Sequence, residues 1–124
     1  MSERRYTKDH EWLLIEGGDV AVIGITDYAQ HALGDLVYIE LPKVGVTYTK
    51  GASCAVVESV KTAAEVYTPV TGDVVAVNSA LESDYDLLKS ETDGWIAKIH
   101  MTKADEIAGL MDKPAYDAYL KTVD

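Results

Sequence analysis

The amino-acid sequence predicts a mainly β fold, and three observations support this class. Short apolar runs recur up to Thr102, separated by turns rich in Gly, Pro, Asp and Ser. The stretch GDLVYI at residues 34–39 returns as GDVVAV at residues 72–77, with the same apolar spacing after a Gly-Asp turn. Helical spacing of apolar residues dominates only after Thr102. These features favour a pseudo-symmetric sandwich or flattened barrel with a helical tail, although a repeat this short also arises by coincidence.

The first predicted elements are a β-hairpin and a short helix. Residues 12–25 contain two apolar runs joined by the sequence EGGD, whose glycines supply the positive φ that a tight turn needs. Thr26 can cap the following segment DYAQHAL, and Gly34 stands where a left-handed residue would end a helix. We therefore expect one or two helical turns directly after the first hairpin.

Further strands and a helical tail are expected in the rest of the chain. The strand candidates, in order, are LVYIEL, SCAVVE, AAEVY, GDVVAV and GWIAKIHM. Asp112 separates two helical segments after Thr102, and Pro114 suits the first turn of the second segment. The residues expected to face inward are Ile107, Leu110 and Met111 in the first segment, and Tyr116, Tyr119 and Leu120 in the second. Residues 1–124 are thus expected to form one domain.

Composition excludes several classes of partner. The 124 residues include 21 acidic and 11 basic side chains, and the formal net charge of −10 would repel nucleic acid and anionic membranes alike. No apolar stretch approaches the ~18 residues of a membrane span, and the N-terminal residues lack the apolar core of an export signal. The single cysteine, Cys54, lies within an apolar run and is expected to be a buried, inert thiol. We expect a cytoplasmic monomer.

Lys61 is the most informative single residue, because it stands at the tip of the predicted hairpin ESVKTAAEVY. An exposed ε-amine remains charged and is a poor nucleophile unless it is desolvated or placed beside another cation. Glu58 and Glu65 flank the lysine and would stabilise its ammonium form, so catalysis by the bare amine is disfavoured. The site offers instead an accessible attachment point for a modifying enzyme. Composition alone also permits an ordinary solvated lysine.

A more specific pattern runs through most of the chain. Its segments are YTKDHEW, GITDYAQHALGDLVYIELPKVG, KGASCAVVESVK, ESVKTAAEVYTPVTGDVVAVN and DGW. This pattern resembles the glycine cleavage system H-protein family. The resemblance implies a hybrid barrel-sandwich fold, as in biotinyl and lipoyl carriers, and lipoic acid amide-linked to Lys61. It also implies a carrier without turnover of its own, with no catalytic residues.

The resemblance implies partners as well as a cofactor. The arm would serve glycine decarboxylase, aminomethyltransferase and dihydrolipoamide dehydrogenase, and a lipoate ligase or lipoyl transferase would attach it. Glu58 and Gly72 match the acidic residue and the glycine that lipoylating enzymes need around the modified lysine. Asp9, Glu11 and Glu65 match positions that line the cleft in which the loaded arm docks. Carboxylates there would hold an ammonium group.

Departures from the family pattern leave a second pathway open. The segment KSETDGW, which ends at Trp95, is shorter than the usual family segment. Thr62 replaces the small residue that commonly follows the lysine, and Tyr85 and Asp86 stand where the family often has a proline. The alternative is therefore an H-protein-like lipoate-binding protein for another pathway, such as one paired with a heterodisulfide-reductase-like complex in bacterial sulfur oxidation.

Other classes of protein fit the sequence less well. A biotinyl carrier would share the exposed hairpin lysine, but that family typically flanks it with methionines, and here the neighbours are Val60 and Thr62. A small unmodified binding module would dock a basic partner on its acidic surface. The histidines, His10, His31 and His100, show no paired spacing, so no metal site is expected.

Overall fold

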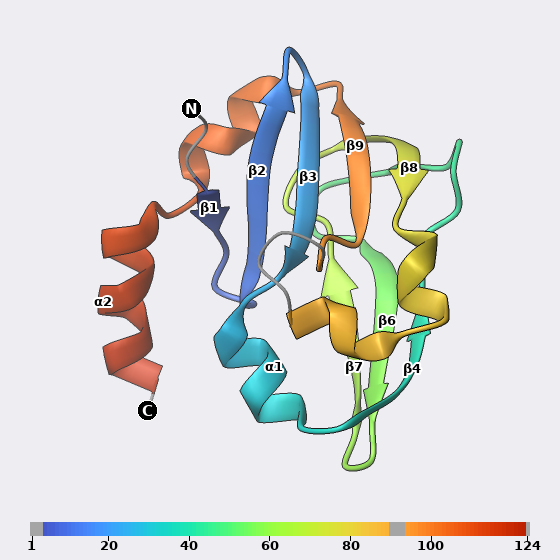
Figure 1. The fold of residues 1–124 in the computed structure, drawn as a ribbon. Coiled ribbons are helices and arrows are strands. Elements are labelled where there is room, and N and C mark those ends of the chain that lie inside the picture. Colours follow the sequence, from blue (N-terminus) through green and yellow to red (C-terminus); the bar gives the residue numbers. More distant parts are fainter. Residues whose placement is uncertain (1–3, 90–93, 124) are drawn as a thin grey trace.

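The computed structural model describes residues 4–89 and 94–123 and contains two antiparallel sheets (Figure 1). The first sheet has six strands in the order β1-β2-β3-β9-β8-β5, and the second has three in the order β4-β6-β7. The strands of the first sheet are β1 (Arg4–Tyr6), β2 (Glu11–Gly17), β3 (Val20–Ile25), β5 (Thr47–Tyr48), β8 (Gly72–Val77) and β9 (Ala97–Met101). Those of the second are β4 (Leu36–Glu40), β6 (Ser53–Ser59) and β7 (Ala63–Tyr67). The predicted mainly β class is confirmed.

Helical segments lie at the margins of the two sheets. The α-helices are α1 (Asp27–Leu33) and α2 (Lys113–Val123), and the 3-10 segments are η1 (Ser79–Glu82), η2 (Tyr85–Lys89) and η3 (Ala104–Gly109). The predicted helical tail is confirmed, although its first segment is a 3-10 helix. Within the described ranges, no helix has both the length and the apolar character needed to cross a membrane.

The elements predicted from local patterns are present, and the shortest ones were not predicted. The hairpin of β2 and β3 turns through Gly18 at a φ of 54°. The Thr26 side chain accepts a hydrogen bond from the Ala29 amide at 3.4 Å and caps α1, which ends at Gly34 with a φ of 81°. The additional strands β1 and β5 contain only 3 and 2 residues, which is too short for an apolar period to be recognised.

Most of the apolar core lies between the two sheets. Leu13, Ile23, Val57, Val74 and Ile99 come from both sheets and are almost completely buried. Leu81 and Leu88 pack on the same cluster and bring η1 and η2 onto it. A second, smaller cluster of Tyr6, Trp12, Val22 and Tyr116 joins α2 to β1 and β2. Two separate apolar clusters therefore connect the helices to the sheets.

The two copies of the sequence repeat lie in different sheets. Residues 34–39 lead into β4, which pairs with β6, whereas residues 72–77 form β8, which lies between β9 and β5. Gly72 is buried where β8 crosses β9 closely. A Cβ atom on Gly72 would collide with the His100 carbonyl oxygen and would lie 2.7 Å from Ile99 Cγ2. The close approach of the two strands therefore requires glycine at this position.

We expect Gly72→Ala to lower the free energy of unfolding by about 1–3 kcal/mol, the usual range for overpacking a dense interior. Gly17→Ala is the matched control, because a Cβ there would meet nothing within 4 Å and should change stability by less than about 0.5 kcal/mol. Urea unfolding of both variants measures the difference. Equal stability of the two variants would show that Gly72 does not constrain the strands.

Candidate functional site

Lys61 lies exposed at the tip of the β6–β7 hairpin, which extends beyond the end of α1 at the bottom of Figure 1. Strand pairing ends at Glu58 opposite Ala63. The buried hydroxyl of Ser59 accepts hydrogen bonds from the amides of Lys61 at 3.1 Å and Thr62 at 3.2 Å. The turn therefore fixes the backbone of Lys61 while its side chain remains in solvent.

The hairpin tip rests against the end of α1. The Val60 amide donates a hydrogen bond to the Asp35 carbonyl at 3.1 Å. The Lys61 side chain passes over Gly34, where an added Cβ would lie 3.8 Å from Lys61 Nζ. The C-terminal end of a helix carries partial negative charge, so this is a favourable position for an ammonium group. A hollow of about 420 Å³, lined mainly by α1, lies beside it.

Glu58 and Glu65 share the outer face of the three-stranded sheet. Glu58 lies directly opposite Tyr38 and Ala63, and Glu65 lies opposite Val56. Residues directly opposite one another in a sheet project on the same side. Two carboxylates therefore lie near Lys61 on one accessible face. Recognition of these carboxylates by a modifying enzyme stays a prediction from the sequence.

Glu11 is a buried carboxylate that joins the two sheets. Its Oε1 accepts a hydrogen bond from Thr7 Oγ1 at 2.9 Å, and its Oε2 accepts one from the Tyr67 amide at 3.0 Å. Glu11 is only 2% exposed, and burial raises the pKa of its carboxyl to about 7 despite these two hydrogen bonds. A cation beside Glu11 would favour the ionised form.

Tyr67 brings the three predicted cleft residues together. Asp9, Glu11 and Tyr67 line one cavity of about 230 Å³. Glu65 lies outside the lining, but its Oε2 accepts a hydrogen bond from the Tyr67 hydroxyl at 3.3 Å. The charge of Glu65 and this hydrogen bond raise the pKa of Tyr67, and the charges of Asp9 and Glu11 act in the same direction. Asp9, Glu11 and Glu65 therefore surround one phenol.

Tyr67 was not among the residues predicted from the sequence. The available signal was its spacing two residues after Glu65, because alternate residues of a strand share a face. Gly72, in contrast, is not among the residues around Tyr67. It lies in β8 of the six-stranded sheet, between β5 and β9. The shortened segment KSETDGW includes residues 90–93, which lie outside the described residues.

The remaining candidate residues have structural surroundings. Cys54 is buried, its Sγ donates to the Val66 carbonyl at 3.4 Å, and burial raises the pKa of its thiol to about 12. The predicted burial of this thiol is confirmed.

The three histidines lie apart from one another. His31 and His100 are exposed, and His10 Nδ1 lies 2.8 Å from the Tyr116 hydroxyl. In residues 4–89 and 94–123, no cluster of His, Cys, Asp and Glu is arranged to hold a metal ion.

A lysine exposed at a hairpin tip, on a two-sheet β fold, fits the class of carriers that bear a covalently attached group. Comparison with known proteins then gives the particular family. The sequence model of the family "Glycine cleavage H-protein" matches residues 4–123, and the chain belongs to that family of lipoyl carrier proteins. It is a carrier and not an enzyme.

Individual relatives match over nearly the whole chain. The glycine cleavage system H protein of Paramagnetospirillum magneticum is 52% identical and covers 100% of both chains. That of Bradyrhizobium diazoefficiens is 53% identical over 96% of this chain and 98% of its own. The crystal structure of a glycine cleavage system H protein from Mycobacterium marinum has a TM-score of 0.86 and 34% identity, covering 96% of this chain and 97% of that one. The predicted family is confirmed.

Burial of Glu11 predicts a pH-dependent contribution to stability. Its pKa is raised from 4.5 to about 7 in the folded protein, so its stabilising contribution is present below pH 4.5 and is lost as the pH rises through 7. Relative to wild type, Glu11→Gln should therefore gain stability between pH 4.5 and pH 8, by up to about 3 kcal/mol at 1.4 kcal/mol per pKa unit. Urea unfolding at the two pH values measures this change.

Glu40→Gln is the matched control for Glu11→Gln, because Glu40 is an exposed glutamate in β4. Its difference from wild type should be the same at both pH values. A pH-independent difference for Glu11→Gln as well would contradict the assigned effect of burial.

Proposed function

We propose that this protein carries lipoic acid, amide-linked to Lys61, and moves aminomethyl groups and reducing equivalents within the glycine cleavage system. Its partners would be glycine decarboxylase, aminomethyltransferase and dihydrolipoamide dehydrogenase. The observation that carries this proposal is the position of Lys61, exposed at a hairpin tip that Ser59 holds, in a chain of this family. We propose that it acts as one carrier domain, as a monomer in the cytoplasm.

The residues around Lys61 fit a covalently attached lipoyl group. The lysine is exposed, its backbone is held by Ser59, and Glu58 is accessible on the adjacent sheet face for a lipoate ligase or lipoyl transferase. When bound, the group supplies a disulfide that opens to hold cargo on one sulfur while the other becomes a thiol. The packing around Gly72 suggests that this residue supports lipoylation through the fold and not through direct contact.

The acidic residues around Tyr67 fit a cationic aminomethyl cargo. Glu65 follows Lys61 by four residues, so it lies at most about 13 Å away along the backbone, at roughly 3.3 Å per residue of extended chain. A lysine side chain alone is too short for this distance, whereas an amide-linked chain of octanoyl length more than doubles its reach. Asp9 and Glu11 in the adjacent cavity would bind the ammonium through charge-assisted hydrogen bonds. Pro69, Leu110 and Met111 line the same cavity and would exclude water from the cargo.

Lys61 should be the site of lipoylation. In protein made with a lipoate ligase, Lys61→Arg should abolish the mass increase, whereas Lys98→Arg should leave it unchanged. Glu58→Ala should slow modification while changing the free energy of unfolding by less than about 0.5 kcal/mol, as expected for a surface position. Intact mass, peptide mass spectrometry and urea unfolding measure these effects. Lipoate on Lys50 or Lys98 in place of Lys61 would refute the assignment.

Removing the carboxylates should release the cargo faster. After loading by a glycine decarboxylase, Glu11→Ala and Glu65→Ala should lose the aminomethyl group, by hydrolysis to ammonia, formaldehyde and the free thiol, roughly 10- to 100-fold faster than wild type. A hydrogen bond to a charged group contributes about 1.5–3 kcal/mol. Glu40→Ala is the control, because Glu40 lies in β4, at the opposite edge of the three-stranded sheet from β7, and does not line the cavity.

Two outcomes of the loading experiment would contradict the glycine cleavage assignment. One is lipoylated wild-type protein that glycine decarboxylase does not load. The other is a loaded arm that decays as fast as free aminomethyl-lipoamide. Reduction by a heterodisulfide-reductase-like complex in place of loading would instead support the alternative pathway.

A further inference from the structure

The turn before β2 has an unusual backbone at its centre. His10 has a φ of 68° and is the one non-glycine residue with positive φ among the described residues. This left-handed conformation is disfavoured for a residue with a Cβ atom. Its neighbours in the chain are Asp9 and Glu11, which both line the cavity of about 230 Å³ that Lys8 and Lys50 also line. The conformation of His10 therefore affects where both carboxylates point.

Local hydrogen bonds hold the backbone of this turn. Thr7 Oγ1 accepts from the amides of Asp9 at 3.2 Å and Glu11 at 3.1 Å, and it donates to Glu11 Oε1. The His10 amide donates to the Thr7 carbonyl at 3.1 Å, and the His10 carbonyl accepts from the Thr26 amide at 2.9 Å. Most of these hydrogen bonds involve main-chain atoms of the turn, and none of them involves the His10 imidazole.

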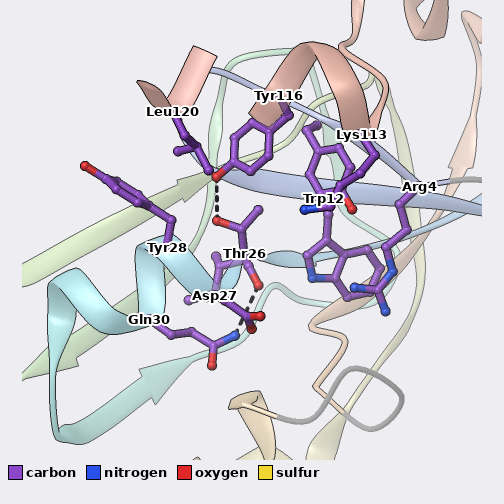
Figure 2. Close-up of a pocket in the computed structure, with 11 residues that line it drawn as sticks. Arg4, Trp12, Thr26, Asp27, Tyr28, Gln30, Lys113, Tyr116 and Leu120 are labelled. Atoms are coloured by element: carbon purple, nitrogen blue, oxygen red, sulfur yellow. Dashed lines mark hydrogen bonds between the residues drawn. The ribbon is translucent and has the colours of Figure 1, made fainter. Parts of the chain in front are cut away.

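The imidazole is held by the C-terminal helix. His10 Nδ1 lies 2.8 Å from the hydroxyl of Tyr116 in α2, and that hydroxyl lies 2.8 Å from Thr26 Oγ1. Figure 2 shows the Tyr116 hydroxyl directed at Thr26 beneath α2. The Tyr28 ring packs on the other side of the imidazole, with ring centroids 4.3 Å apart. Side-chain contacts from α1 and α2 therefore enclose His10.

Tyr116 itself is well fixed. Its side chain is 2% exposed, and its ring stacks on Tyr6 with centroids 4.7 Å apart and an angle of 7° between the planes. Loss of the hydroxyl alone would leave this stack in place. The hydroxyl can therefore be removed without removing the packing of α2 on β1.

We propose that Tyr116 is a positioning residue for the cavity lined by Asp9 and Glu11. The Tyr116 hydroxyl holds the His10 imidazole and so keeps the left-handed turn, and this turn directs both carboxylates into the cavity. The consequence for cargo rests on the proposed function, whereas the effect on the turn does not. Lipoylation should be unaffected, because the hairpin tip is held separately by Ser59.

The first test uses unloaded protein. Tyr116→Phe is compared with Tyr38→Phe, which removes the hydroxyl of an exposed tyrosine in β4 that does not line the cavity. NMR titration of the Glu11 carboxyl should give a lower midpoint in Tyr116→Phe, shifted from about 7 towards 4.5 as water enters the loosened turn. Tyr38→Phe should titrate like wild type. Identical midpoints in all three proteins would overturn the proposal.

The second test measures decay of the methylamine-loaded arm. Tyr116→Phe should lose cargo several-fold faster than wild type, while Tyr38→Phe should not. In a His10→Gly background, Tyr116→Phe should cause no further change, because glycine adopts positive φ without a side-chain clamp. An equal effect of Tyr116→Phe in both backgrounds would show that the hydroxyl does not act through His10.

The two tests separate this proposal from the proposed function. If the wild-type arm decays as fast as free aminomethyl-lipoamide, the proposed function fails, and the Glu11 titration still decides the role of Tyr116. A Tyr116→Phe variant with a lower melting temperature but an unchanged Glu11 midpoint would reduce Tyr116 to a structural residue and refute the proposal.

Discussion

The buried carboxylate of Glu11 is the interaction on which the functional part of the structure depends. It accepts a hydrogen bond from the Tyr67 amide at the end of β7, so it joins the six-stranded sheet to the three-stranded sheet. The same carboxylate lines a cavity with Asp9, Lys8 and Lys50. Burial of a carboxylate opposes its ionisation, which is why its pKa lies near 7. The ionised form is therefore destabilised at this position, and a cation bound beside it would favour that form.

The proposed carrier function uses two parts of the molecule. The hairpin tip holds Lys61 on a backbone fixed by Ser59 and leaves its side chain exposed. Asp9, Glu11 and Tyr67 line a cavity at the other end of β7, and Glu65 accepts a hydrogen bond from the Tyr67 hydroxyl outside that lining. An arm tethered to Lys61 that moved between solvent and this cavity would keep its cargo at high effective concentration near each site in turn. The length of β7 would then set the distance over which the arm works.

The C-terminal helix connects a distant part of the sequence to the cleft. The helix α2 packs on β1 through stacked Tyr6 and Tyr116, and the Tyr116 hydroxyl reaches Thr26 and His10. The cap of α1 and the turn before β2 thus share one hydrogen-bonded group. A small aromatic cluster outside the main core couples these elements, because its Tyr116 hydroxyl lies within hydrogen-bonding distance of both His10 Nδ1 and Thr26 Oγ1.

The sequence by itself determined the mainly β class, most of the strands, the capped helix α1 and the position of Lys61 at a hairpin tip. These features depend on apolar periodicity, turn composition and local caps, which act between residues close in the chain. The family pattern also pointed to Asp9, Glu11 and Glu65 as cleft residues.

Only the tertiary structure decided how those cleft residues meet. Glu11 and Tyr67 are 56 positions apart, and His10 and Tyr116 are 106 positions apart. The burial of Glu11, the central place of Tyr67 and the clamp on His10 arise when separate elements pack together. Such contacts carry no local period, because each joins residues that only the packing of the two sheets and α2 brings within hydrogen-bonding distance.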